Sequence, residues 1–300
     1  MKIIDCFLYF NEQDLLEERI SILSQHVDLF IILEFGKTFS GIRKDQSIDL
    51  SFVDEKSRSK IIYCFIENED CIQSNDTLAR TNWDQSLIWK HNGKKPKELE
   101  KSNQREIKHR DALAGLIYTV AETEDVIMIS DIDEIPKPKV VQDIKLNYRK
   151  YLDKITYIKM DWRIYFSDYN CDSSWFGTYI TSLSLLKLRS IDELRVSSPH
   201  LNNPNGQVVI DGGIHLSYLG GIASIKSKLE ALGHQGFRAK FTKLLVCISP
   251  KLSLFLLRNG YDLLLQRRNL QVVPIDENHF ISNSFLKKYS IVNHLRQFNR

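Results

Sequence analysis

Short apolar runs alternate with helical patterns along this sequence, and that alternation limits the possible fold more than any other feature. Residues 3–10 form the first run. Residues 12–26 then repeat Leu and Ile at helical spacing, with Asn11 expected to cap the helix. Strands separated by helices pair in parallel, and both faces of such a sheet are covered. We therefore predict an α/β fold with a mostly parallel, mixed sheet and helices on both faces. Further strands are expected at 29–34, 61–66, 126–130 and 155–160, and further helices at 103–121 and 222–232.

The strand expected at 126–130 runs directly into the acidic residues Asp131, Asp133 and Glu134. Open α/β sheets bind ligands at the carboxyl ends of their strands, so these side chains lie where a ligand is expected. Two carboxylates separated by one residue converge on one divalent cation if the backbone turns. Mg²⁺ or Mn²⁺ then completes its shell with substrate phosphates. The alternative is a loop of solvated acids that caps the next helix.

Charge is distributed unevenly although the net charge is only +3. From Lys226 to the end, the sequence has 13 Lys and Arg against 4 Asp and Glu, with Leu and Phe between them. A basic, partly apolar segment of this kind favours an anionic surface. We expect peripheral membrane contact and no nucleic-acid partner. The alternative is a solvated helical face that packs on the main domain.

Nothing at the N-terminus resembles a secretory signal, because Lys2 is followed by only two apolar residues before Asp5. The most apolar late stretch, 244–257, is interrupted by Pro250 and is too short to span a bilayer. The five cysteines are odd in number and scattered, which is typical of reduced thiols. These features predict a cytoplasmic protein that is at most peripheral to a membrane.

Four motifs follow one another along the chain: DCFLYFNE at 5–12, TFSG at 38–41, SDIDEIP at 130–136 and GIHLSYLGG at 213–221. In this order they resemble glycosyltransferase family 17, which includes the β-1,4-mannosyl-glycoprotein β-1,4-N-acetylglucosaminyltransferase. The likeness spans roughly residues 3 to 290. It implies a GT-A-type fold, a UDP-sugar donor, a divalent metal (Mn²⁺ or Mg²⁺) and an inverting displacement.

The resemblance also implies a domain organisation and a substrate class. We expect one GT-A-like catalytic domain over 1–300, with a basic, mainly helical C-terminal portion from about 222. The expected donor is UDP-N-acetylglucosamine, and the expected acceptor is a glycan or a glycolipid. The family usually has Trp before the histidine of the last motif, where this chain has Ile214, so sugar contacts are expected to differ.

The family pattern assigns the metal ligands to three residues. Asp133 is expected to bind the ion directly, and Asp131 to contact the ribose or the metal and its water shell. His215 is expected to complete the shell, because neutral imidazole is an acceptable ligand. Gly212 and Gly213 precede this histidine, and small residues let the backbone approach a ligand closely.

An inverting transfer needs a general base that takes the proton of the acceptor hydroxyl. Asp211, four residues before His215, is the first candidate, and Glu134 and Asp161 are alternatives. Aromatic side chains stack on sugars, so the tryptophans are candidates for an acceptor platform, although large aromatics are more often part of a core. These are Trp83, Trp89, Trp162 and Trp175.

The donor nucleotide is expected at the first strand-to-helix edge, where Phe10, Asn11 and Glu12 meet a uracil or a ribose. Glu34, at the end of the second expected strand, is a further candidate for a ribose contact. His234 either meets a phosphate or caps a helix. Two arginines on the helix before the acidic strand are expected to contact the pyrophosphate, unless they pair with nearby surface acids. They are Arg105 and Arg110.

Two other functional interpretations remain open at the level of the sequence. Phosphatases of the haloacid dehalogenase type also place Asp-x-Asp after an apolar strand, with the first Asp as nucleophile. There the motif opens the domain and is followed by Thr or Val, whereas this chain has Ile135. The other interpretation is a catalytically inactive carbohydrate-binding relative, because a fold does not guarantee its chemistry.

Overall fold

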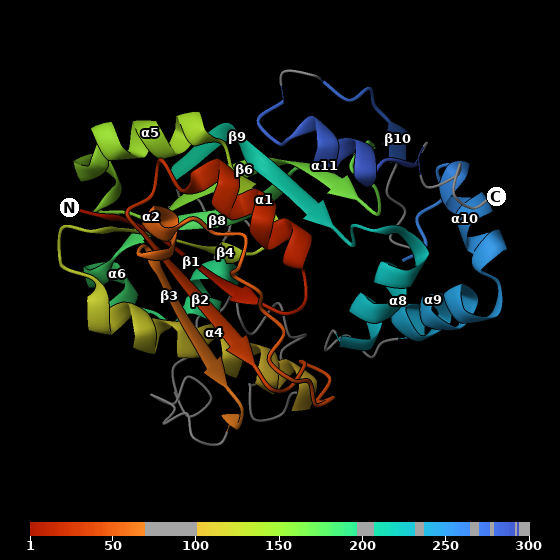
Figure 1. The fold of residues 1–300 in the computed structure, drawn as a ribbon, viewed down its shortest axis with the longest axis horizontal. Coiled ribbons are helices and arrows are strands. Elements are labelled where there is room, and N and C mark those ends of the chain that lie inside the picture. The colour runs from red at the N-terminus through yellow and green to blue at the C-terminus, as the bar shows by residue number, and fades with distance from the viewer. Residues whose placement is uncertain are drawn as a thin grey trace.

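A computed structural model describes residues 1–69, 101–196, 207–231, 237–264, 270–276, 279–291 and 293. Its centre is one large β-sheet with helices on both faces (Figure 1). The strand order is β10-β7-β6-β8-β4-β1-β2-β3, and β9 and β5 continue from β6 off this path. The strands are β1 Ile3–Tyr9, β2 Leu29–Phe35, β3 Ile61–Ile66, β4 Val126–Asp131, β5 Glu134–Pro136, β6 Thr156–Ile164, β7 Tyr169–Cys171, β8 Trp175–Ser182, β9 Gln207–Ser217 and β10 Leu270–Val272.

Along the chain, the helices of the described residues alternate with these strands or groups of strands. All five predicted strands and the predicted helices at 12–26, 103–121 and 222–232 are present within a few residues of their expected bounds. The helices are α1 Gln13–Leu23, α2 Glu55–Arg58, α4 Lys101–Val120, α5 Pro138–Leu146, the 3-10 helix η3 Tyr148–Tyr151, α6 Leu183–Leu188, α7 Ile191–Val196, α8 Gly221–Ala231, α9 Phe237–Ile248, α10 Pro250–Arg258 and α11 Asn283–Lys288.

The first half of the sheet is parallel, because β3, β2, β1 and β4 all run in one direction. Alternate residues of these strands face opposite sides, as the pleat requires. Ile3 and Phe7 pack with α1, α5 and α11, whereas Ile4 and Cys6 pack with α4, α6 and α7. Both faces are therefore buried, which explains why these strands are apolar throughout.

The second half of the sheet is mainly antiparallel. β8 pairs antiparallel with β4 and β6, while β6 and β9 pair in parallel. The short strand β5 pairs antiparallel with β9, so that Glu134 lies opposite His215. The predicted α/β fold with a mixed sheet and helices on both faces is confirmed. Parallel pairing is confined to the first half and to the β6–β9 pair.

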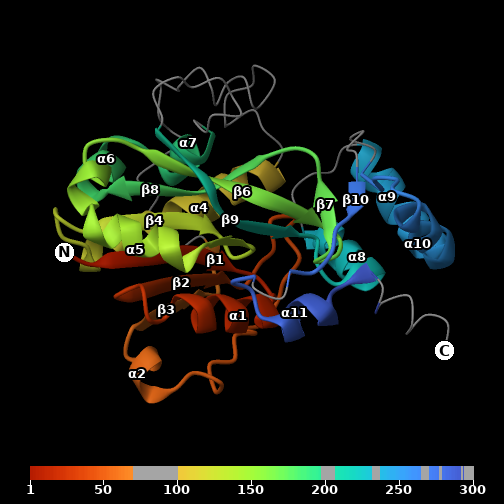
Figure 2. The same cartoon turned by 90° about the horizontal axis from the view of Figure 1, so that it is seen from above.

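The described part of the C-terminal portion contains the helices α8, α9, α10 and α11. Helices α8, α9 and α10 lie at one end of the sheet (Figure 2). Their apolar residues, such as Ile225 and Leu257, form a separate core cluster with Ile164 of β6 and Tyr169 of β7. Strand β10 adds to the edge of the sheet, and α11 returns to pack against α1. Among the described helices, none combines the length and the apolar character needed to cross a membrane.

Candidate active site

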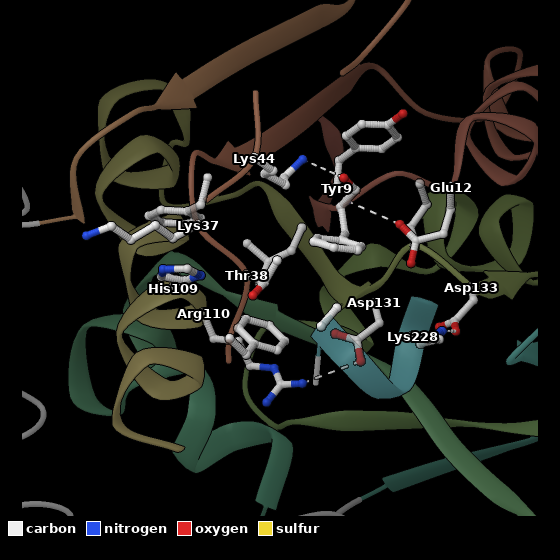
Figure 3. A pocket seen from close by; sticks show the side chains of 16 residues that line it. Tyr9, Glu12, Lys37, Thr38, Lys44, His109, Arg110, Asp131, Asp133 and Lys228 are labelled. Atoms are coloured by element: carbon white, nitrogen blue, oxygen red, sulfur yellow. Dashed lines mark hydrogen bonds and ion pairs between the residues drawn. The ribbon is translucent and has the colours of Figure 1, made fainter. Parts of the chain in front are cut away.

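A cavity opens at the carboxyl ends of β1, β2 and β4 (Figure 3). This is the edge at which an open α/β sheet binds its ligand. One part of the wall is aromatic and aliphatic: Leu8, Tyr9, Phe10, Phe35, Phe39, Ile132 and Ala231. The remaining lining is polar or charged: Glu12, Lys37, Thr38, Lys44, His109, Arg110, Asp131, Asp133 and Lys228. The cavity is thus lined by apolar and charged side chains together.

Asp131 ends β4 and faces two arginines. Arg195 Nη2 lies 2.6 Å from Asp131 Oδ2, and Arg110 Nη2 lies 3.5 Å from the same oxygen. Arg110 comes from α4, as predicted, and Arg195 comes from α7. No pattern in the sequence singled out Arg195. Its guanidinium also bonds Glu134 at 3.0 Å, so one arginine bridges two acids of the motif.

Asp133 is enclosed by a different set of partners. Lys228 Nζ of α8 lies 2.6 Å from Asp133 Oδ2, and His215 Nε2 lies 3.5 Å from Oδ1. Burial by itself would raise the pKa of the Asp133 carboxyl, but Lys228 and His215 outweigh it and hold this pKa far below its ordinary value. The carboxylate is therefore ionised at neutral pH and ready to accept a cation.

The predicted metal ligands are only partly brought together. In the portions of the chain that the structure describes, no group of three or more His, Cys, Asp or Glu side chains is placed to hold a metal ion. The structure pairs the Asp131 carboxylate with two arginines. An ion shared by Asp131, Asp133 and His215 stays a prediction, and Asp133 and His215 are the two of these residues that lie next to each other.

Asp133 and His215 nevertheless fit a divalent ion. Carboxylate oxygen and imidazole nitrogen suit Mn²⁺, and such ions commonly take their remaining ligands from substrate phosphates and water. The His215 ring lies beside Trp162 and Trp175, and its Nδ1 is buried with no hydrogen-bond partner among the described residues. Nε2 is the ring nitrogen that faces Asp133, so it is the atom that would bind an ion held between the two residues.

Glu134 is a structural carboxylate. It is fully buried, and it accepts hydrogen bonds from Trp175 Nε1 at 2.8 Å and from the backbone N–H of Thr178 at 3.2 Å. Arg195 pairs with the same group. A Cβ atom on Gly177 would lie 2.7 Å from Glu134 Cδ, so this neighbour has to be glycine. The geometry does not support Glu134 as the general base, because protein groups already surround its oxygens.

The other two candidates for the base also lie away from the cavity. Asp211 is 76% exposed and pairs with Lys137 at 2.6 Å, and its backbone has a φ of 54°. Asp161 pairs with Arg163 at 2.6 Å. Neither residue lines the cavity that holds Asp131 and Asp133. The geometry therefore does not support Asp211, because the strand β9 turns its side chain toward Lys137.

The first strand-to-helix edge contributes to the cavity as predicted. Phe10 and Glu12 line it, and Glu12 Oε2 accepts from the N–H groups of Phe10 and Asn11 at 3.2 and 3.1 Å. Asn11 was expected to cap α1, but the helix begins after Glu12 and the Asn11 amide instead accepts from Ser47. Asn11 lines an adjacent cavity, which shares Phe10, Glu12 and Lys228 with the first.

Glu34 does not reach the cavity. Its side chain is fully buried, where it accepts hydrogen bonds from Tyr63 at 2.6 Å and from Ser47 Oγ at 2.7 Å and pairs with Lys44. The predicted ribose contact through Glu34 is therefore not supported. Its partner Lys44 lines the cavity instead. Glu34 acts by positioning that ammonium.

Arg105 is also held away from the cavity. Its Nε pairs with Glu69 at 3.0 Å, and Nη1 donates to the carbonyl of Phe39 at 2.8 Å. The expected pyrophosphate contact through Arg105 is not supported, whereas Arg110 does face the cavity. Arg110 also pairs with Glu106, one turn earlier on the same helix. The His109 ring stacks on Phe35 at 3.6 Å and completes this wall.

The remaining predicted contacts divide into three groups. Trp162 and Trp175 both flank His215, so an aromatic platform is present at that residue. Ile214 points the other way into the core and is 1% exposed, so a residue at this position does not touch a sugar. Trp83, Trp89 and His234 lie outside the residues that the structure describes.

A buried arginine fixes the backbone of the acidic turn. Arg19 of α1 pairs with Asp5 of β1 at 2.6 Å, and both side chains are fully buried. Its Nη1 also donates to the carbonyls of residues 131, 132 and 134 at 3.2, 3.2 and 2.8 Å. The sequence contains a pattern that indicates this buried pair. Arg19 lies on the apolar stripe of α1, and Asp5 interrupts an apolar strand, so two charges are expected to meet.

The sequence model of glycosyltransferase family 17 matches residues 1–247. The fold and the site thus belong to a glycosyltransferase, and the chain is a member of glycosyltransferase family 17. The haloacid dehalogenase interpretation is excluded by this membership. The mixed sheet, with its ligand edge at β1, β2 and β4, is that of the expected GT-A-type fold.

Two solved structures of S. aureus TarS 1-349 are also similar to this chain. The complex with UDP-GlcNAc is 13% identical with a TM-score of 0.41, and the match covers 83% of this chain and 73% of that chain. The complex with UDP is 12% identical with a TM-score of 0.35, covering 81% and 65%. No curated protein matches the sequence.

Proposed function

We propose that this glycosyltransferase moves N-acetylglucosamine from UDP-N-acetylglucosamine to a glycan or glycolipid acceptor with inversion at the anomeric carbon. The observation that carries the proposal is the cavity itself. Its aromatic side chains suit a flat base, and its charged side chains include the ionised Asp133, which lies beside His215. A nucleoside diphosphate sugar likewise combines an aromatic ring with an anionic diphosphate.

In this proposal the acceptor hydroxyl oxygen bonds the anomeric carbon while the bond from that carbon to the β-phosphate oxygen breaks. The proton leaves to a general base, and the electron pair leaves with UDP. Asp133 and His215 would hold Mn²⁺ or Mg²⁺, which supplies positive charge for the departing diphosphate. Arg110, fixed against Asp131, adds a guanidinium on the opposite wall, where it complements phosphate oxygens.

We also infer that the acceptor is presented at a membrane, on the cytoplasmic side. Helices α9 and α10 expose Phe241, Leu244, Ile248, Leu252 and Phe255. Residues 237–261 contain five Lys and Arg and no acid, so this hairpin complements an anionic lipid surface. The cysteines of the described residues, Cys6, Cys64, Cys171 and Cys247, are all free, which agrees with a reducing compartment.

A thermal-shift panel of nucleotide sugars, with and without Mn²⁺, tests the donor. A ligand that binds only the folded state at 100 times its Kd adds about 2.7 kcal/mol, which raises Tm by roughly 5 °C in a chain of this size. We expect this shift for UDP and UDP-N-acetylglucosamine with Mn²⁺, together with slow hydrolysis of the sugar nucleotide. No shift with any nucleotide sugar would favour the inactive carbohydrate-binding relative.

The substitution Asp133→Ala tests the site. We expect it to remove the Mn²⁺-dependent UDP shift while the folded state persists, because Asp133 is the innermost carboxylate of the cavity. Asp133→Asn keeps the shape of the side chain and serves if the alanine variant fails to fold. Asp153→Ala, an exposed carboxylate outside the cavity, is the matched control. Wild-type affinity for Mn²⁺ and UDP in both Asp133 variants contradicts the assignment.

A further inference from the structure

Lys228 is placed at the centre of the site, although neither the motifs nor the spacing assigned it a role. Its Nζ lies 2.6 Å from Asp133 Oδ2, and the side chain is 24% exposed. It borders both the main cavity and the adjacent one, as Glu12 does. The ammonium also lies over the Tyr218 ring, 5.5 Å from the centroid. Figure 3 shows the Lys228 and Asp133 side chains together at one end of the cavity.

The fold holds Lys228 in this position from both ends of its helix. Three residues with positive φ precede or begin α8, namely Tyr218, Gly220 and Gly221, so the chain turns sharply out of β9 into the helix. At the other end, the Ser40 N–H donates to the carbonyl of Ala231 at 3.0 Å, and Ser40 Oγ donates to that of Glu230 at 2.7 Å. The motif at 38–41 thus anchors the helix that carries Lys228.

We propose that the Lys228 ammonium competes with the divalent ion for the Asp133 carboxylate, and that it moves to the donor diphosphate when the ion binds. This inference rests on the proposed function. An ammonium 2.6 Å from a carboxylate oxygen and a divalent cation bonded to the same carboxylate repel each other strongly at a buried site. The two cations therefore compete for Asp133.

The competition has a consequence for the order of binding. A diphosphate offers Lys228 a second anionic partner inside the same cavity, so nucleotide and metal together compensate for the lost ion pair with Asp133. The metal alone does not compensate for it. Mn²⁺ is therefore expected to bind weakly to the free protein and tightly in the presence of UDP. Lys228 also keeps the buried Asp133 carboxylate paired while the donor is absent, which avoids an isolated buried charge.

The experiment measures Mn²⁺ affinity without nucleotide, by electron paramagnetic resonance of free Mn²⁺ and by calorimetry. Lys228→Met removes the ammonium but keeps most of the apolar stem. We expect Lys228→Met to bind Mn²⁺ at least tenfold more tightly than wild type, and to bind UDP in EDTA at least tenfold more weakly. Lys226→Met is the matched control, because Lys226 is exposed on the same helix. It should bind both ligands like wild type.

Unchanged Mn²⁺ affinity in a folded Lys228→Met protein overturns the inference. A gain that persists in the double variant Lys228→Met with Asp133→Asn overturns it as well, because the ion then binds elsewhere. Should Lys228→Met not fold, Lys228→Arg keeps the charge and must keep the weak Mn²⁺ affinity of wild type. If wild type binds no UDP even with Mn²⁺, the proposed function fails, while the comparison of Mn²⁺ affinities still decides the role of Lys228.

Discussion

At the scale of single residues, the acidic turn depends on a side chain that never meets the ligand. Arg19 is buried beneath the turn, pairs with Asp5 and donates to three backbone carbonyls of the motif. It also donates to Ser130 Oγ at 2.7 Å. These bonds fix where the Asp131 and Asp133 side chains leave the backbone. Arg19 is therefore a positioning residue for the site.

Replacing Arg19 by Met is expected to destabilise the protein by about 3–5 kcal/mol, because it leaves the Asp5 carboxylate buried without a partner. Asp5→Asn combined with Arg19→Met should cost less than the sum of the two single changes, because neither charge is then isolated. Urea unfolding measures both. Arg43→Met is the control: its pair with Glu67 is exposed, so the loss should stay below about 1 kcal/mol. Additive costs in the double variant would contradict the role given to the pair.

At the scale of elements, α9 and α10 form a hairpin, and both helices expose apolar side chains. Leu244 and Ile248 of α9 and Phe255 of α10 are 56%, 73% and 60% exposed. The opposite sides of both helices are buried, through Val246, Leu254 and Leu257. Each helix thus carries apolar residues on both its inner and its outer side. The inner side packs in the core, and the outer side needs a partner outside this packing.

We expect the protein to sediment with vesicles that contain phosphatidylglycerol and to remain in solution with phosphatidylcholine alone. Leu244→Ser combined with Phe255→Ser should weaken this binding on the order of tenfold or more, because each apolar side chain contributes by its burial. Raising the salt concentration should weaken it further by screening the basic residues. Leu146→Ser with Leu188→Ser is the control, since these exposed residues lie on α5 and α6. Equal loss in both pairs would rule out the hairpin as the docking face.

At the scale of the whole molecule, the late helix α11 packs against the early helix α1. Phe285 and Leu286 of α11 belong to the same core cluster as Leu16 and Ile20 of α1. The contact is reinforced at the surface, where Ser282 Oγ donates to Glu18 at 2.9 Å. Strand β10 also pairs with β7 within the single sheet. The last part of the chain, beyond the residues matched by the family model, therefore contributes to the main core.

Phe285→Ala should lower the free energy of unfolding of the whole chain by about 3–5 kcal/mol, because it leaves a cavity in the shared core. Unfolding is expected as one transition, followed in urea by circular dichroism and by tryptophan fluorescence. Phe255→Ala, at an exposed site, should stay within about 0.5 kcal/mol of wild type. A variant that shifts only a separate, second transition would show that the C-terminal portion folds as a unit of its own.

The sequence by itself determined the elements and the place of the site. Apolar runs and helical spacing depend only on which local residues are buried, so β1, α1, β2 and β4 were predictable from pattern. The carboxyl ends of parallel strands share one edge, which located Phe10, Glu12, Asp131 and Asp133 in advance. The ordered motifs indicated the family, which the family model confirms over residues 1–247.

Only the tertiary structure decided which charges meet. Three basic residues come from helices that are far apart in the sequence: Arg110, Arg195 and Lys228. The two arginines pair with Asp131 and the lysine pairs with Asp133, so the two acids belong to separate ion pairs. Other contacts between distant segments enclosed Glu34 and Glu134, while Asp211 stayed at the surface beside Lys137. The physical reason is that burial follows a local period, whereas ion pairing depends on the distance between atoms of distant segments. That distance exists only once the sheet and its helices have assembled.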